Sequence, residues 1–98
     1  MFSWFDAHAA KEFGSEMARS YIQRVPLSSE LTERKFAVKS KQVFEQMHKR
    51  ATSFKQQHRL NTYKIAQMGN TFKWELKDAG YEPQYVDELT QWLVAQVR

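Results

Sequence analysis

The sequence contains no cysteine, which excludes disulfide bonds and thiolate metal sites. It has only two prolines and three glycines, and the glycines stand singly at Gly14, Gly69 and Gly80, so no glycine-rich loop is available to hold a phosphate group. No stretch approaches the run of about 18 apolar residues that a membrane-spanning helix needs. The first residues lack the basic segment and long apolar core of a signal peptide. These absences favour a cytoplasmic protein.

The residues that are present indicate a globular chain. Hydrophobic residues make up 42% of the sequence and charged residues 27%, as is usual for soluble domains. Seven Phe, four Tyr and three Trp supply apolar area that offsets the entropy lost on folding, which argues against disorder. A chain of 98 residues fits one domain, so we expect residues 1–98 to form a single helical unit.

The net charge of +4 is concentrated in the middle of the chain. Residues 34–64 hold nine Lys or Arg and one acid, Glu45, whereas residues 1–33 and residues 65–98 each carry a net charge of −2. The acidic ends can neutralise the basic middle within the fold or between chains, and a partner that carries phosphates can do the same. The distribution therefore leaves self-association and nucleic-acid binding as two alternatives.

The stretch from Ser29 to Arg59 contains neither Gly nor Pro, and its pattern predicts one long helix over 29–59. Its apolar and small residues recur at helical steps and wind within an arc of about 120°. The Lys and Arg residues fall outside this arc or at its edge, and only Val38 breaks the division. Because His58 lies within the arc, we expect it to be a hydrogen-bonded core histidine. The arc comprises Phe36, Ala37, Ser40, Val43, Phe44, Met47, Ala51, Phe54 and His58.

The first helix is predicted over about 4–23. Ser3 and Asp6 have the spacing of a capping box, in which each side chain reaches the backbone N–H of the other. Gly14 weakens the middle of this helix by about 1 kcal/mol relative to alanine. The apolar residues on either side of it nevertheless keep a helical spacing, so the segment is expected to remain one helix.

Asn61 predicts a break after the long helix, because asparagine caps a helix well and fits poorly inside one. The alternative is a single helix that continues through this point. With the break, a third helix is predicted over 62–79, closed by Gly80 in a left-handed conformation. Pro83 suits the first turn of a fourth helix, predicted over 83–97.

These segments predict an all-α protein, an irregular antiparallel four-helix bundle with one long central helix. A helix of about 30 residues spans about 45 Å, whereas helices of 15–20 residues cover about 22–30 Å. Part of the apolar flank from Phe36 to His58 is therefore expected to stay uncovered in a monomer. A symmetric homodimer would cover it most simply.

The third helix carries the most unusual pattern. Tyr63, Asn70 and Trp74, flanked by Lys77, wind to the side opposite its core residues. A surface helix does not need aromatic residues on that side, so three interpretations stay open: burial by another helix of the chain, a homo-oligomer interface, or a groove for another molecule. Gly69 would let a neighbouring helix approach this flank closely. We take Tyr63, Asn70, Trp74 and Lys77 as the candidate protein-contact patch.

Patterns for catalysis and metal binding are weak. Glu45 and His48 form a single Glu-x-x-His pair, whereas di-iron bundles need two such pairs and two further carboxylates, so only a dimer could complete a site. The three histidines, His8, His48 and His58, lack zinc-ligand spacing. No Ser or Thr stands in a glycine-flanked elbow. We therefore expect no enzyme activity, no cofactor and no metal.

The leading hypothesis is a small basic, non-enzymatic interaction or scaffold protein that self-associates, most simply as a homodimer, with an unknown protein partner as a further option. The alternative is sequence-nonspecific nucleic-acid binding by the basic face of the long helix, with a steep dependence on salt. Against this alternative, the cations spread over more than half of the helix circumference and no DNA-binding motif is legible. The candidate nucleic-acid face comprises Arg34, Lys35, Lys39, Lys49, Arg50 and Arg59.

Overall fold

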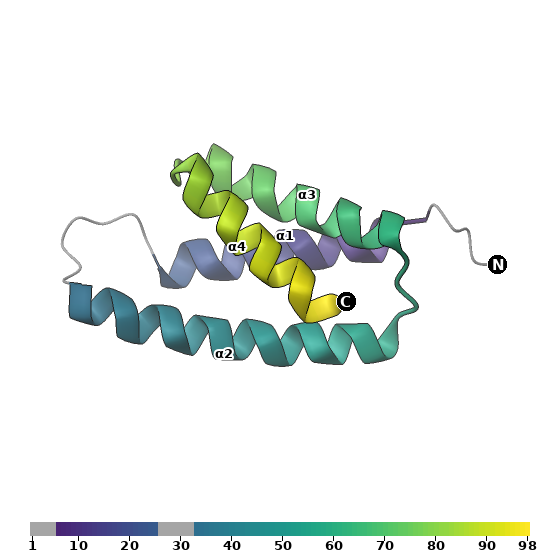
Figure 1. Ribbon diagram of the computed structural model, residues 1–98, viewed down its shortest axis with the longest axis horizontal. Helices are drawn as coiled ribbons and strands as arrows, with labels where there is room; N and C mark the ends of the chain where they lie inside the picture. Colours follow the sequence, from purple (N-terminus) through teal and green to yellow (C-terminus); the bar gives the residue numbers. More distant parts are fainter. Residues whose placement is uncertain (1–5, 26–32) are drawn as a thin grey trace.

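The computed structural model describes residues 6–25 and 33–98, with side chains in the second range from Ala37 onward. Successive helices run in opposite directions (Figure 1). The predicted all-α four-helix bundle is confirmed. Within the described ranges the helices are α1 (His8–Arg24), α2 (Glu33–Gln57), α3 (Thr62–Asp78) and α4 (Pro83–Val97).

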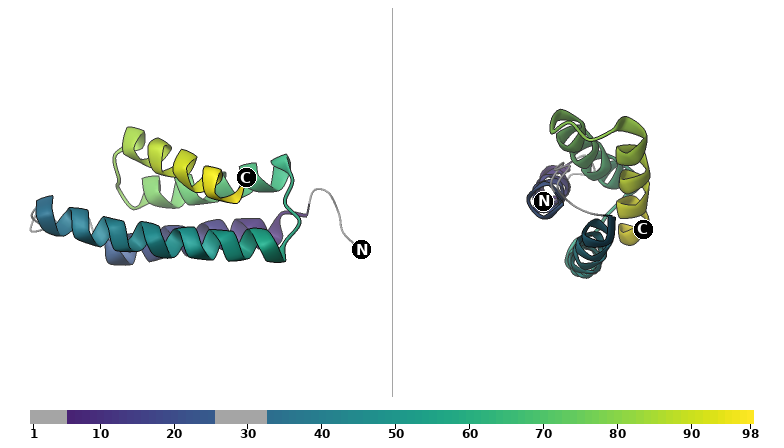
Figure 2. Two further views of the ribbon diagram at one scale, coloured as in Figure 1. Left: turned by 60° about the horizontal axis from the view of Figure 1, so that its bottom comes forward. Right: turned by 90° about the vertical axis from the view of Figure 1, so that its left-hand side faces the viewer.

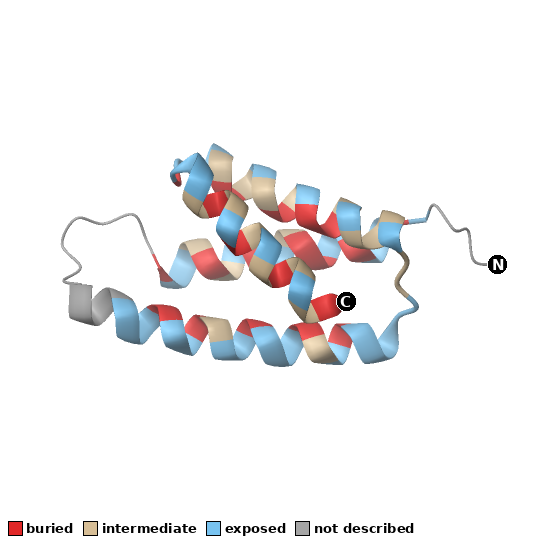
Figure 3. Ribbon diagram, viewed as in Figure 1, coloured by how far each residue is buried: buried red, intermediate tan, exposed pale blue. Residues whose placement is uncertain are grey.

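Each helix packs against two others in the described part of the chain. Helix α1 contacts α2 and α3, and α4 contacts the same two helices. Figures 1 and 2 show that α1 and α3 run parallel and that α4 lies obliquely across the space between α3 and α2. The long helix α2 therefore forms one side of the bundle instead of its centre, because α3 packs on α1 and not on α2. Its outward surface is exposed along the described length (Figure 3).

Helix α1 begins at His8, later than the predicted start. Asp6 and Ala7 precede the helix, and the Asp6 carboxylate accepts a hydrogen bond from the His8 backbone N–H at 3.2 Å. Ala7 stands at the N-cap and has no side-chain oxygen to offer the first turn. The prediction was wrong for residues 6 and 7 because Asp6 acts before the helix and not inside it. Ser3, its predicted capping partner, lies outside the described residues.

The predicted break after the long helix is confirmed, and the alternative of one continuous helix is wrong. Helix α2 ends at Gln57, and Asn61 caps α3 in an extended conformation. The Asn61 side chain accepts a hydrogen bond from the Lys64 backbone N–H at 2.8 Å, which satisfies one of the otherwise unpaired amides of the first turn. Residues 29–32 of the predicted long helix lie outside the described residues.

The turn between α3 and α4 closes as predicted, with Gly80 in the left-handed region at φ 97°. The Gly80 N–H donates to the Lys77 carbonyl at 3.0 Å, and the Tyr81 N–H donates to the Leu76 carbonyl at 3.2 Å. This pair of bonds is the Schellman arrangement, and its usual apolar contact is supplied by Leu76 and Tyr81, which are both buried. The chain therefore reverses direction with few unpaired carbonyl groups.

Helix α4 starts at Pro83, as predicted, with Glu82 as its N-cap. The Glu82 carboxylate accepts hydrogen bonds from the backbone N–H groups of Gln84 and Tyr85, at 3.1 Å and 2.8 Å. A proline in the first turn loses no helical hydrogen bond, because its amide would have had no partner there. Two consecutive residues, Glu82 as the N-cap and Pro83 in the first turn, thus specify where α4 begins.

The buried residues of each helix lie on the sides of the ribbon that face the other helices (Figure 3), so the core lies between the helices. On α2 the buried residues run from Ser40 through Val43, Met47 and Ala51 to Phe54. The expectation that part of this flank stays uncovered is wrong for most of Ser40–Phe54, where Phe44 is half-buried, because α1 runs beside it and α4 crosses it. At the two ends of the flank, Ala37 and His58 are exposed, as expected. The largest side chains that are fully buried are Tyr21, Phe72, Met17, Met47, Met68, Leu76 and Leu93.

Helices α1 and α3 approach each other to backbone contact at Gly14. A β-carbon at Gly14 would lie 2.4 Å from the carbonyl oxygen of Met68 and 3.2 Å from its carbonyl carbon. Neither atom can move without displacing α3, because both belong to its backbone. Glycine at this position is thus required by the packing of two helices, although it lowers the helix propensity of α1.

We expect Gly14→Ala to destabilise the fold by about 1–3 kcal/mol, the usual cost of overpacking, despite a gain of about 1 kcal/mol in helix propensity. Gly69→Ala is the matched control, because the nearest atom to its new β-carbon is the side-chain Cγ2 of Val94 at 3.1 Å, which can shift. Urea unfolding of both variants measures the difference. Equal stability of the two variants would contradict the backbone contact.

Candidate functional site

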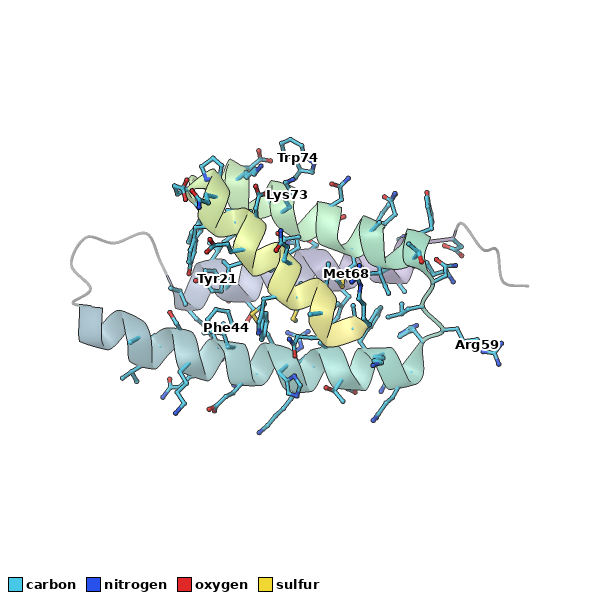
Figure 4. The ribbon with its side chains drawn as sticks, viewed as in Figure 1. Tyr21, Phe44, Arg59, Met68, Lys73 and Trp74 are labelled. Atoms are coloured by element: carbon cyan, nitrogen blue, oxygen red, sulfur yellow. The ribbon has the colours of Figure 1, made fainter. Side chains whose placement is uncertain are left out.

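The most exposed large aromatic side chain in the described ranges is Trp74 on α3. Its side chain points away from the bundle (Figure 4), and 55% of its surface is exposed. The Lys77 ammonium group lies over the indole ring, with Nζ 5.5 Å from the ring centroid. This cation–π contact restricts both side chains. Trp74 is therefore presented to solvent with the Lys77 ammonium group over its ring.

An ion-pair network lies beside Trp74, between α3 and α4. The Asp87 Oδ1 atom is 3.5 Å from Lys73 Nζ and 3.7 Å from Lys77 Nζ. Asn70 is exposed one turn before Trp74 on the same side of α3. We call this surface, made of Asn70, Lys73, Trp74, Lys77 and Asp87, the Trp74 patch.

The structure separates Tyr63 from the rest of the predicted contact patch. Tyr63 lies in the first turn of α3, half-buried, and packs against the core. It precedes Trp74 by eleven residues, which is about 16 Å along a helix axis. Asn70, Trp74 and Lys77 thus form one surface, and Tyr63 belongs to another part of α3.

The flank of α3 at Gly69 is covered by the chain itself. A β-carbon at Gly69 would meet Val94 and Thr90 of α4, so α4 is the helix that approaches closely on this side. The helix that Gly69 allows to approach thus belongs to the same chain. Burial by the same chain, one of the three interpretations of the Tyr63–Asn70–Trp74 side, holds in part for Tyr63, which is half-buried. It does not hold for Trp74, whose indole ring stays largely exposed.

The predicted nucleic-acid face is spread around α2. The Lys39 side chain lies beside Arg24 of α1 in a shallow groove, and Arg50 forms an ion pair with Glu16 of α1 at 2.8 Å. Lys49 is exposed on the outer side of the same helix. These cations do not form one stripe. The side chains of Arg34 and Lys35 lie outside the described residues.

The remaining member of that face, Arg59, follows the end of α2 and points away from the bundle (Figure 4). It belongs to an open groove of about 380 Å³ at the end of the bundle. Three segments meet there: the start of α1, the end of α2 and the start of α3. We call this cavity the end groove. Sequence reasoning missed it, because its lining residues are far apart in the chain.

The prediction that His58 is a core histidine is wrong. Helix α2 ends at Gln57, so His58 leaves the apolar flank and is exposed. Its imidazole lies against the ring of Phe54, with centroids 4.4 Å apart, and Phe54 stacks in turn on Phe13 at 4.3 Å. His58 thus covers an aromatic pair at the edge of the end groove.

The buried titratable groups at the other end of the bundle are tyrosines. The hydroxyls of Tyr21 and Tyr85 share a hydrogen bond, and the Tyr81 hydroxyl donates to the Val25 carbonyl at 2.5 Å. Burial, together with Tyr85, raises the pKa of Tyr21 well above its ordinary value and raises that of Tyr81 too. The Ser40 hydroxyl on α2 opposes the shift in the pKa of Tyr21. Protonated phenols that join α1 to α4 act here as structural contacts.

This tyrosine cluster should make the fold sensitive to alkali. In the unfolded chain Tyr21 loses its proton near pH 10.0, whereas in the fold it keeps the proton to higher pH. The folded state then binds more protons, so the free energy of unfolding should fall as the pH rises above about 10. Tyr21→Phe should show a shallower fall over that range, measured by urea unfolding with pH 7 as the reference. An equally steep fall would show that Tyr21 does not cause it.

No helix in the described ranges is both long and apolar enough to cross a membrane. Nor does that part of the chain bring three or more His, Asp or Glu side chains into a group that could hold a metal ion. Glu45 and His48, considered for a shared di-iron site, are both exposed on α2, and His48 Nδ1 lies 2.6 Å from Gln96 Oε1. Comparisons with protein-family models, with curated proteins and with solved structures found no match to this chain.

Proposed function

We propose that the protein is a non-enzymatic interaction protein that associates with a second copy of itself through the Trp74 patch. The observation that supports this proposal most directly is the exposure of Trp74, at 55%, on the outer side of α3. Tryptophan is enriched at the energetic centres of protein interfaces, because burying its large ring there removes much apolar surface from contact with water. The lack of cysteine also favours the cytoplasm as its location.

The fixed geometry of the patch supports recognition of a partner. Trp74 is held by the ammonium group of Lys77, and Lys77 is held by Asp87. The side chains of Lys73 and Lys77 are 34% and 24% exposed, so they have fewer conformations to lose on association than fully exposed lysines. A surface that is already ordered loses less conformational entropy when it binds.

The charges of the patch favour a second copy as the partner. A two-fold interface brings the same surface of two molecules together, so it must be complementary to itself. The patch carries Lys73 and Lys77 beside Asp87, and Asp78 is exposed at the end of the same helix. A patch that carries both signs of charge can therefore pair a lysine of one copy with an aspartate of the other across a two-fold axis near Trp74.

The coverage of α2 narrows this proposal. The length of α2 does not argue for a dimer over Ser40–Phe54, because most of that flank is buried within one chain. The exposed α2 residue Val38, at 54%, stands apart from the Trp74 patch on another helix. The interface is therefore proposed at the Trp74 patch, on α3 and the neighbouring Asp87 of α4, and not on α2.

We expect Trp74→Glu to weaken self-association by about 30-fold, which corresponds to about 2 kcal/mol for the removal of a central aromatic side chain. Val38→Glu is the matched control, because Val38 is equally exposed and receives the same charge. It should change the association constant by less than about threefold, as surface substitutions outside an interface do. Sedimentation equilibrium over a range of concentrations gives the three constants.

Two outcomes would contradict the proposal. A wild-type chain that stays monomeric at every concentration would remove self-association as a function of the Trp74 patch. Equal weakening by Trp74→Glu and Val38→Glu would show that added negative charge, and not the loss of the indole ring, causes the effect.

The second candidate function is binding of nucleic acid by α2. It is favoured by one observation: the described part of α2 exposes Lys39, Lys41, Lys49, Arg50 and Lys55 and only one acid, Glu45. Within residues 6–25 and 33–98, no helix covers the outward side of α2 (Figure 3). A phosphate backbone that follows this side would release counterions from itself on binding.

We expect the double variant Lys39→Ala with Lys49→Ala to lower the salt dependence of DNA binding by about 0.9 in log–log slope for each phosphate that is no longer neutralised. The control is Lys11→Ala with Arg98→Ala, which removes the same charge from exposed positions outside α2. Fluorescence anisotropy with labelled duplex DNA at two salt concentrations measures both slopes. No binding at about 50 mM salt, or equal slopes for the two variants, would exclude this function.

A further inference from the structure

The end groove combines an apolar floor with an open mouth. Its volume of about 380 Å³ lies within the range of small-molecule sites, roughly 300–1,000 Å³. Ala10 of α1, Phe54 of α2 and Leu60 of the turn before α3 line it. Ala10 and Phe54 are buried and Leu60 is half-buried, so these residues form its floor.

The Phe54 ring, which forms part of the floor, packs against two other rings. The Phe54 ring is stacked on Phe13 at 4.3 Å with an interplanar angle of 12°, and its other neighbour is the imidazole of His58 at 4.4 Å. The Phe54 ring is thus already packed against two other rings without a ligand. The groove is therefore formed before binding, as most small-molecule sites are.

The mouth of the end groove carries net positive charge. Arg59 and Lys64 are cations at neutral pH, and His8 stands beside them at the start of α1. One carboxylate, that of Asp6, also lines the groove, and it accepts a hydrogen bond from the His8 backbone N–H. Two cations against one carboxylate leave an excess of positive charge at the edge of an apolar floor.

We infer that the end groove binds a small amphipathic anion, with its apolar chain on the floor of Ala10, Phe54 and Leu60 and its carboxylate or phosphate head at Arg59 and Lys64. The floor provides area for an alkyl chain, and an arginine guanidinium pairs with either anionic head through parallel N–H bonds. This site is independent of the Trp74 patch, which lies on the outer side of α3.

The probe is hexyl phosphate, titrated into the ¹⁵N-labelled full-length chain and followed by amide chemical shifts. We expect saturable shifts confined to residues 8–10 and 54–64. Inorganic phosphate and hexanol, which each carry one half of the probe, should bind at least about tenfold more weakly, because each can make only one of the two interactions. Hexanoate in a parallel titration tells whether a carboxylate head is accepted in place of phosphate, and binding of either acid supports the site.

Variants separate the groove from the rest of the surface. Ala9 is exposed on α1 and lines the groove, so Ala9→Phe should fill it and lower the affinity for hexyl phosphate at least about tenfold. Ala95→Phe makes the same change at an exposed position of α4 outside the groove, and it should leave the affinity unchanged. Arg59→Ala should weaken hexyl phosphate and leave hexanol unaffected, with Lys49→Ala as its control.

Three results would overturn the inference. The first is amide shifts that spread along α2 and do not gather at the end groove. The second is an affinity for hexyl phosphate no higher than that for inorganic phosphate or hexanol. The third is an unchanged affinity of Ala9→Phe for hexyl phosphate. Trp74→Glu should bind hexyl phosphate as the wild type does, so loss of self-association and loss of the groove are told apart in the same set of proteins.

Discussion

The backbone contact between Gly14 and Met68 sets the arrangement of the other helices. It brings α1 and α3 together as parallel neighbours, so α2 and α4 must complete the ring from the outside. The contact between α1 and α2 is looser, and it is bridged by side chains such as Arg50 and Glu16. Cavities lined by residues of both α1 and α2, including the end groove, lie along this looser boundary.

The charged side chains contribute little to the free energy of folding. The ion pair of Arg50 with Glu16 is half-exposed, and pairs of this kind contribute about 0–1 kcal/mol to folding. The core, from Met17 to Leu93, carries the stability instead. Changing the charges of α2 or of the Trp74 patch should therefore cost the fold little.

Features that depend on neighbours in sequence were predictable, and features that depend on contacts between helices were not. Asn61 and Gly80 determine backbone conformation through their own side chain, or through the lack of one, so the break and the turn follow from the sequence. The exposed side of α3 likewise follows from its winding. From the sequence, Gly14 only lowers the helix propensity of α1. That glycine is required there is seen only in the structure, where the Met68 backbone packs against it. His58 matches the apolar period of α2 but lies beyond the end of that helix. The burial of the α2 flank could not be predicted, because it depends on the oblique course of α4. The end groove could not be predicted either, because the start of α1, the end of α2 and the start of α3 meet there only in the fold.

The bond from the Tyr81 hydroxyl to the Val25 carbonyl joins the end of α1 to the turn between α3 and α4. Val25 is the C-cap of α1, so its carbonyl has no partner within that helix. If α4 moves away together with the turn that carries Tyr81, the last turn of α1 loses the hydrogen bond to its Val25 carbonyl at the same moment. Amide protons at the end of α1 and in α4 should therefore exchange with solvent through one shared opening event, and not through separate fraying of each helix.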